Sequence, residues 1–170
     1  MNALILSVQT VSFITSIGNA ILSKTISRTA DSICGLVGYI SNYDQPYAQD
    51  VKRELIKIDL EFTVSVLRQF VEENKNKEFS DYEKQALLGV NDALEEINKE
   101  LEDIKIAMKH HETKYFYKWR SLNCKSSICL IKKYKKVLDN RYNILMDFLK
   151  IKDNQKIDNQ KVDNQKVDNQ

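Results

Sequence analysis

Glycine and proline are scarce in this sequence, with four Gly and one Pro in 170 residues. Both residue types interrupt regular helices and form turns. Their scarcity, together with long segments of helical periodicity, argues against a turn-rich β-fold. We therefore predict an all-α fold, an antiparallel bundle of about four long helices. We place this single domain at residues 1–151 and a separate tail at residues 152–170.

Cysteines and early charges are also few. The three cysteines are an odd number, and the first charged residue after the amino terminus is Lys24, so the basic start of a secretory signal is missing. We therefore expect no disulfide framework, and we expect an intracellular, cytoplasmic location. The heavy use of Lys, Asn and Ile is typical of AT-rich genomes, including those of viruses.

Motifs that carry catalysis are missing from the sequence. It has no nucleophile elbow, phosphate-binding glycine loop or metalloprotease helix. His110, His111, Cys124 and Cys129 are the candidate metal ligands, but adjacent histidines on a helix point about 100° apart. We predict a protein that is not an enzyme and that holds no metal or cofactor. His111 is expected to be buried at the end of the bundle.

The sharpest local signal begins the central helix. Ser80 and Glu83 match a capping box, in which each side chain bonds the backbone N–H of the other residue. A seven-residue apolar repeat follows. Leucine at one seam position and isoleucine at the other favours bundles of three or four helices. The predicted core seam consists of Leu87, Val90, Leu94, Ile97, Leu101, Ile104 and Met108.

Acidic residues gather between Asp92 and Asp103, including Glu95, Glu96 and Glu100. They do not form the Glu-x-x-His motifs of di-iron bundles. We predict that they lie on a solvated outer face of the central helix.

Residues 2–23 carry no charged side chain but repeat apolar residues at helical spacing. The segment is long enough to span a membrane, yet several polar residues dilute it. A spanning helix, reversible membrane association and burial in the bundle are all open, and burial is favoured. The pattern continues to Ile40, and the pair Gly35 and Gly38 predicts a bend or a close helix contact.

The second predicted helix covers residues 46–74 and opens with Pro46. Two apolar stripes run along it, which predicts contact with more than one neighbour. The first stripe is Val51, Leu55, Ile58, Phe62, Val66 and Phe70. The second is Ile56, Leu60, Val64, Leu67 and Val71.

After the central helix the charge becomes basic, with aromatic residues interleaved. Such a run suits phosphates, unpaired bases or anionic lipid headgroups. The simpler alternative is that Phe116 and Trp119 pack in the core while the lysines are solvated. The candidate anionic-surface residues are Lys109, Lys114, Lys118, Arg120, Lys125, Lys132, Lys133, Lys135 and Lys136.

A last helix is expected to bury Ile128, Ile131, Leu138, Tyr142, Leu145 and Leu149. Beyond Ile151 the chain repeats Lys-Ile-Asp-Asn-Gln and then Lys-Val-Asp-Asn-Gln. A period of five matches neither helix nor strand, so we predict a disordered, low-complexity tail.

The order of segments resembles the HeLo-type four-helix bundle of mixed-lineage-kinase-domain-like pseudokinases and fungal prion-associated proteins. The resemblance rests on residues 93–102, the basic stretch after them and the closing helix that ends near Phe148 and Leu149. It implies an oligomerising domain that associates with membranes through its first helix and basic residues, and no catalytic residues carry over.

The leading hypothesis is a non-enzymatic protein-interaction or assembly module, partnered by another protein or by a second copy of itself. The first alternative is peripheral association with an anionic membrane surface, through residues 2–23 and the basic run. The second alternative is a nucleic-acid-binding accessory protein. The net charge of only +2 makes nucleic acid the less favoured partner.

Overall fold

The structure is a computed structural model that describes residues 19–116 and 121–167, with side chains as far as residue 151. This described part is all-α, with five α-helices, one short 3-10 helix and no strand, as the composition predicts. The elements are α2 (Asn19–Ser41), η1 (Pro46–Ala48), α3 (Gln49–Ile58), α4 (Leu60–Asn74), α5 (Asp81–Glu112) and α6 (Lys125–Val167).

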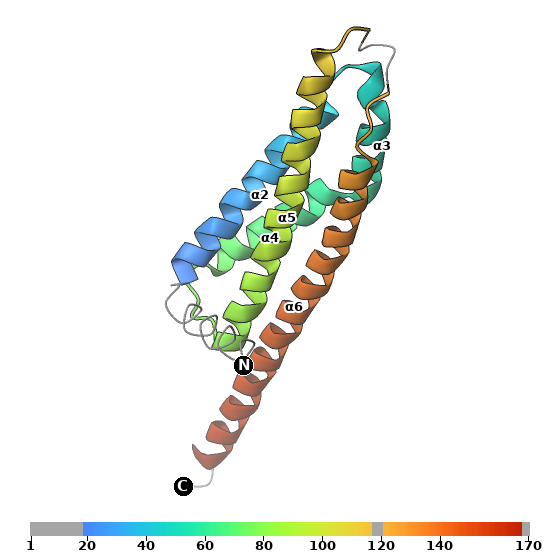
Figure 1. Cartoon of the computed structure of the whole chain (residues 1–170). Coiled ribbons are helices and arrows are strands. Elements are labelled where there is room, and N and C mark those ends of the chain that lie inside the picture. Colours follow the sequence, from blue (N-terminus) through green and yellow to red (C-terminus); the bar gives the residue numbers. More distant parts are fainter. Residues whose placement is uncertain (1–18, 117–120, 168–170) are drawn as a thin grey trace, which may run out of the picture.

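The contacts of α5 with α6 and of α4 with α2 define two helix pairs, and α2 contacts α5 more extensively than it contacts α4 (Figure 1). Helices α5 and α6 lie side by side and run in opposite directions, and they form the most extensive contact of the molecule. Helix α4 packs against α2, and α2 in turn packs against α5, which joins the two pairs. Helix α3 contacts the first part of α6, so the chain between α2 and α5 touches both pairs.

Helix α5 begins as the capping box predicts. The backbone N–H of Glu83 donates to Ser80 Oγ at 3.4 Å, and the N–H of Ser80 donates to Glu83 Oε2 at 2.5 Å. All seven residues of the predicted core seam are at most 2% exposed. They face the interior together because a seven-residue repeat returns to nearly the same side of a helix.

Helix α2 continues through Gly35 and Gly38 as one helix. A Cβ atom built at either glycine would meet nothing within 4 Å, so the predicted close contact at these positions is wrong. The buried side of α2 carries Ile26, Ile33 and Ile40, each fully buried and spaced by seven residues. The predicted helix over residues 2–18 lies outside the described residues.

The predicted single helix over residues 46–74 is wrong. Asp59 adopts the left-handed conformation (φ 52°, ψ 42°), which ends α3 and starts α4. Aspartate tolerates this conformation better than most non-glycine residues. The buried stripe therefore differs on the two sides of the break. Helix α3 buries Val51 and Leu55 of the first stripe. Helix α4 instead buries four residues of the second stripe, namely Leu60, Val64, Leu67 and Val71.

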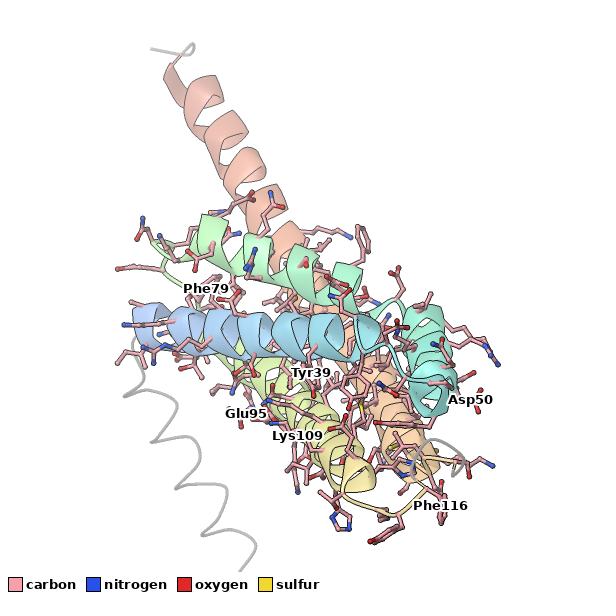
Figure 2. All side chains as sticks on the ribbon, turned by 90° about the horizontal axis from the view of Figure 1, so that it is seen from above. Tyr39, Asp50, Phe79, Glu95, Lys109 and Phe116 are labelled. Carbon is pink, nitrogen blue, oxygen red and sulfur yellow. The ribbon has the colours of Figure 1, made fainter. Side chains whose placement is uncertain are left out.

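Helix α6 buries Ile128, Ile131, Leu138 and Leu145 against the other helices, and Tyr142 and Leu149 are partly buried beside them. Its backbone stays helical to Val167, and its end projects beyond the other helices (Figures 1 and 2). The prediction of disorder after Ile151 is therefore not confirmed. The repeats contain no Gly or Pro, and adding residues to an existing helix costs far less than nucleating a new one.

Among the described residues, no helix has the length and apolar character that a membrane crossing requires.

Candidate functional site

The described lysines of the basic run lie on different elements of the fold. Lys109 and Lys114 lie at the end of α5, whereas Lys125 and Lys132 line a groove between α3 and α6. A third group follows on the sides of α6, namely Lys133, Lys135 and Lys136. Two further members of the candidate set, Lys118 and Arg120, lie outside the described residues.

The end of α5 and the residues after it form the first surface, which we call the tip: Lys109, Lys114, Tyr115 and Phe116. Tyr115 is 89% exposed and Phe116 is 75% exposed, so the alternative in which Phe116 packs in the core is wrong. Their ring centroids lie 6.3 Å apart, and Figure 2 shows Phe116 at the outer end of the molecule. Two large neighbouring rings that are exposed among the described residues form a candidate interaction surface.

Phe116 also has a positive φ of 57°. A bulky residue in this region of conformational space is a true outlier, and such outliers concentrate at functional sites. This backbone conformation occurs four residues after the end of α5, at a residue whose ring is exposed.

A cluster of aromatic and polar side chains fixes the base of the tip. Tyr43, in the link after α2, donates a hydrogen bond from its hydroxyl to Glu112 Oε1 and lies 3.1 Å from the hydroxyl of Tyr47. Burial and then the bond to Glu112 raise the pKa of Tyr43 far above its ordinary value. His111 is buried with its ring 4.4 Å from that of Tyr47, in agreement with its place on the seam. The end of α5 is therefore anchored to η1.

The groove between α3 and α6 is the second surface. Glu54 on α3 accepts hydrogen bonds from Lys132 Nζ at 2.6 Å and from Lys57 Nζ at 2.7 Å. These two bonds lower the pKa of Glu54 to about 2. Lys132 thus shares the single negative charge of Glu54 with Lys57, and its side chain stays half exposed.

The third surface is the side of α6. Lys135 pairs with Asp139 at 2.9 Å, and Lys133 lies 5.7 Å from the ring centroid of Tyr134. Lys136 is exposed, and no ion pair involves it in the described part of the chain. Lys133 and Lys136 are thus exposed lysines on the side of α6 that no carboxylate holds among the described residues.

The acidic face of α5 is not uniformly solvated. Glu100 is buried, which corrects its predicted place on the outer face. Glu96 lies against Tyr134 of α6 and raises the pKa of that tyrosine through its charge, with burial and a hydrogen bond adding to the shift. Glu100 is covered and Glu96 meets Tyr134 because α6 packs closely on α5 and contacts residues beyond the apolar seam.

One surface was not predicted. The first apolar stripe of the sequence leaves Phe62 and Val66 on the outer side of α4, 66% and 40% exposed. They lie one turn apart beside a groove between α2 and α4 whose polar rim includes Asp31 and Arg68. The two apolar stripes predicted that this segment contacts more than one neighbour. Which of the two stripes stays exposed depends on the break at Asp59.

The described residues contain no arrangement that supports a metal site or a reactive cysteine. No group of three or more His, Cys, Asp or Glu side chains in it is arranged to hold a metal ion. The three cysteines are free, and burial raises the pKa of the Cys124 thiol. A raised thiol pKa lowers the thiolate fraction, which is the nucleophilic form.

Comparison with known proteins gives no match to any family model, curated protein or solved structure. The resemblance to HeLo-type bundles therefore stays a prediction. Function has to be inferred from the surfaces themselves.

Proposed function

We propose that this protein is an intracellular, non-enzymatic module, an antiparallel four-helix bundle that assembles with a second copy of itself through the outer face of α4. The supporting observation is the exposed pair Phe62 and Val66 on a helix whose opposite side is buried. Large exposed apolar patches rimmed by polar residues mark interaction surfaces.

The rim of this face favours a second copy as the partner. Arg68 of α4 pairs with Asp31 of α2, and both side chains are about half exposed, at 48% and 57%. A face with an apolar centre and charges of both signs at its edge is complementary to itself, as a two-fold symmetric dimer requires. Exposed ion pairs cost little to rearrange when such an interface forms.

Sedimentation velocity at tens of micromolar tests this proposal. The wild-type protein is expected to show a mass that rises with concentration, and the double variant Phe62→Ser/Val66→Ser is expected to stay monomeric. The matched control is Tyr115→Ser/Phe116→Ser, which removes two exposed apolar side chains at the tip. A wild-type protein that is strictly monomeric over this range contradicts self-assembly through α4.

A second candidate function is peripheral binding to an anionic membrane through the tip. Tyr115 and Phe116 project from the end of the bundle, and Lys109 and Lys114 have no ion-pair partner among the described residues. Aromatic rings favour the interface between lipid and water, and each lysine near an anionic leaflet contributes about 1 kcal/mol. Residues 2–23 remain part of this hypothesis.

Co-sedimentation with vesicles that contain anionic lipid tests the tip. Lys109→Glu/Lys114→Glu is expected to lose most of the bound fraction, because two attractive charges become repulsive. Lys133→Glu/Lys136→Glu makes the same charge change on the side of α6 and is expected to bind like the wild type. Equal binding by both variants contradicts a role of the tip. Nucleic-acid binding is the less favoured alternative, because the net charge of the chain is only +2.

A further inference from the structure

The groove between α3 and the first turns of α6 has the form of a small-molecule site. It has a volume of about 420 Å³, and ligand pockets typically measure roughly 300–1,000 Å³. Its floor is apolar, formed by Val51, Leu122 and Ile128 with the thiol of Cys124 beside them. Because burial raises the pKa of Cys124, its sulfur stays protonated and behaves as a small apolar group.

The charged side chains around the groove have a positive balance. Glu54 is held by Lys132 and Lys57, and Asp50 pairs with Arg53 at 3.4 Å. Lys125, at the start of α6, is the one charged lining residue without an ion-pair partner among the described residues. The groove therefore combines an apolar floor with a positive balance of charge, and Lys125 is the lining cation that no carboxylate holds among the described residues.

We propose that this groove binds an amphiphilic anion, an alkyl carboxylate whose chain lies over the apolar floor and whose head pairs with Lys125. Each methylene that leaves water contributes about 0.8 kcal/mol, which supplies the affinity. The carboxylate accepts a charge-assisted hydrogen bond from the ammonium group, which selects an anionic head over a neutral one. This ligand site is independent of self-association through α4 and of the tip.

Isothermal titration with decanoate, below the concentration at which it forms micelles, tests the proposal on the full chain. Saturable binding is expected, and Lys125→Glu is expected to weaken it by at least about fivefold, the equivalent of about 1 kcal/mol. Lys136→Glu makes the same change on an exposed lysine of α6 outside the groove, and it is expected to leave the affinity unchanged. Decanol, which has the same chain and no charge, is expected to bind more weakly than decanoate.

Protection of a cysteine thiol from alkylation by a bound ligand provides a second test that does not use calorimetry. Cys129 lines the groove and is exposed, whereas Cys34 lies on α2 away from it. Alkylation by iodoacetamide, followed residue by residue with mass spectrometry, is expected to slow at Cys129 when decanoate is present. The rate at Cys34 is expected to stay constant and serves as the internal control.

Three results overturn the proposal: no saturable binding of decanoate, wild-type affinity in Lys125→Glu, or equal affinity for decanol. Leu122→Asp places a negative charge on the apolar floor and is expected to abolish binding, and circular dichroism first establishes that the variant is folded. Leu130→Asp on α6 is the matched control, because Leu130 is also half-buried and lies outside the groove.

Discussion

The two helix pairs of this bundle are held together by different chemistry. Between α5 and α6, fully buried side chains such as Leu94, Leu101 and Leu138 form a continuous apolar core. Arg141 of α6 adds a hydrogen bond to the carbonyl oxygen of Gly89, where a Cβ atom would lie only 3.3 Å from the arginine Cδ. Glycine at position 89 thus leaves room for the side chain of Arg141.

Between α2 and α4, polar contacts supplement a smaller apolar core. Ser27 donates a hydrogen bond to Glu72 Oε1 at 2.9 Å, Arg68 pairs with Asp31, and Cys34 lies 3.8 Å from Ser65. An exposed ion pair contributes about 0–1 kcal/mol and a part-buried hydrogen bond about 0.5–1.5 kcal/mol, each less than one fully buried leucine. We infer that α5 and α6 form the stable scaffold and that α4 is the helix most easily rearranged, which suits it to an assembly surface.

The largest expected effect is in the scaffold. Leu101→Ala should lower the free energy of unfolding by about 2–5 kcal/mol, because Leu101 is fully buried and its truncation leaves a cavity. Denaturant unfolding measures the change. Ile106→Ala on the same helix, where Ile106 is 61% exposed, should change stability by less than about 0.5 kcal/mol. Similar losses in both variants would contradict the assignment of the core.

A smaller effect is expected in the α2–α4 pair. Ser27→Ala removes the hydrogen bond to Glu72 and should cost about 0.5–1.5 kcal/mol. Hydrogen exchange is the sharper measurement, since the amides of α4 should exchange faster while those of α5 keep their protection. Ser32→Ala, an exposed serine of the same helix, is the control. Equal acceleration in α4 and α5 would show that the two pairs open as one unit.

A pH-dependent effect is expected where α3 meets α6. Lys132 and Lys57 lower the pKa of Glu54 from 4.5 to about 2, so its carboxylate stabilises the folded state above pH 4.5. This contribution should disappear as the pH falls from 4.5 towards about 2, where the folded protein finally binds the proton. Thermal unfolding of Glu54→Gln should depend less on pH across that range. Glu61→Gln, an exposed acid of α4, should retain the wild-type dependence.

The smallest effect on stability is expected at the carboxyl-terminal end of α6, outside both helix pairs. Deletion of residues 152–170 should leave the melting temperature nearly unchanged, because this end of α6 projects beyond the other helices (Figure 1). Differential scanning calorimetry measures it. A large fall in melting temperature would mean that the repeats contribute to the packed domain.

Much of the scaffold could be predicted from the sequence because it depends on local, periodic signals. A seven-residue repeat determines which side of α5 is apolar, and Ser80 with Glu83 determines where α5 begins. The burial of His111 also follows from its place in that repeat. These features need only the geometry of one helix.

The remaining features depend on contacts between distant segments. Aspartate at position 59 is compatible with a helix, so its left-handed conformation and the exposure of Phe62 could not be read from the chain. Lys132 of the basic run forms an ion pair with Glu54, which lies 78 residues away in the sequence. Local periodicity thus determined an all-α scaffold with a buried seam. Tertiary packing decided which apolar and basic side chains stay available to a partner, because only packing determines which of them are covered or neutralised.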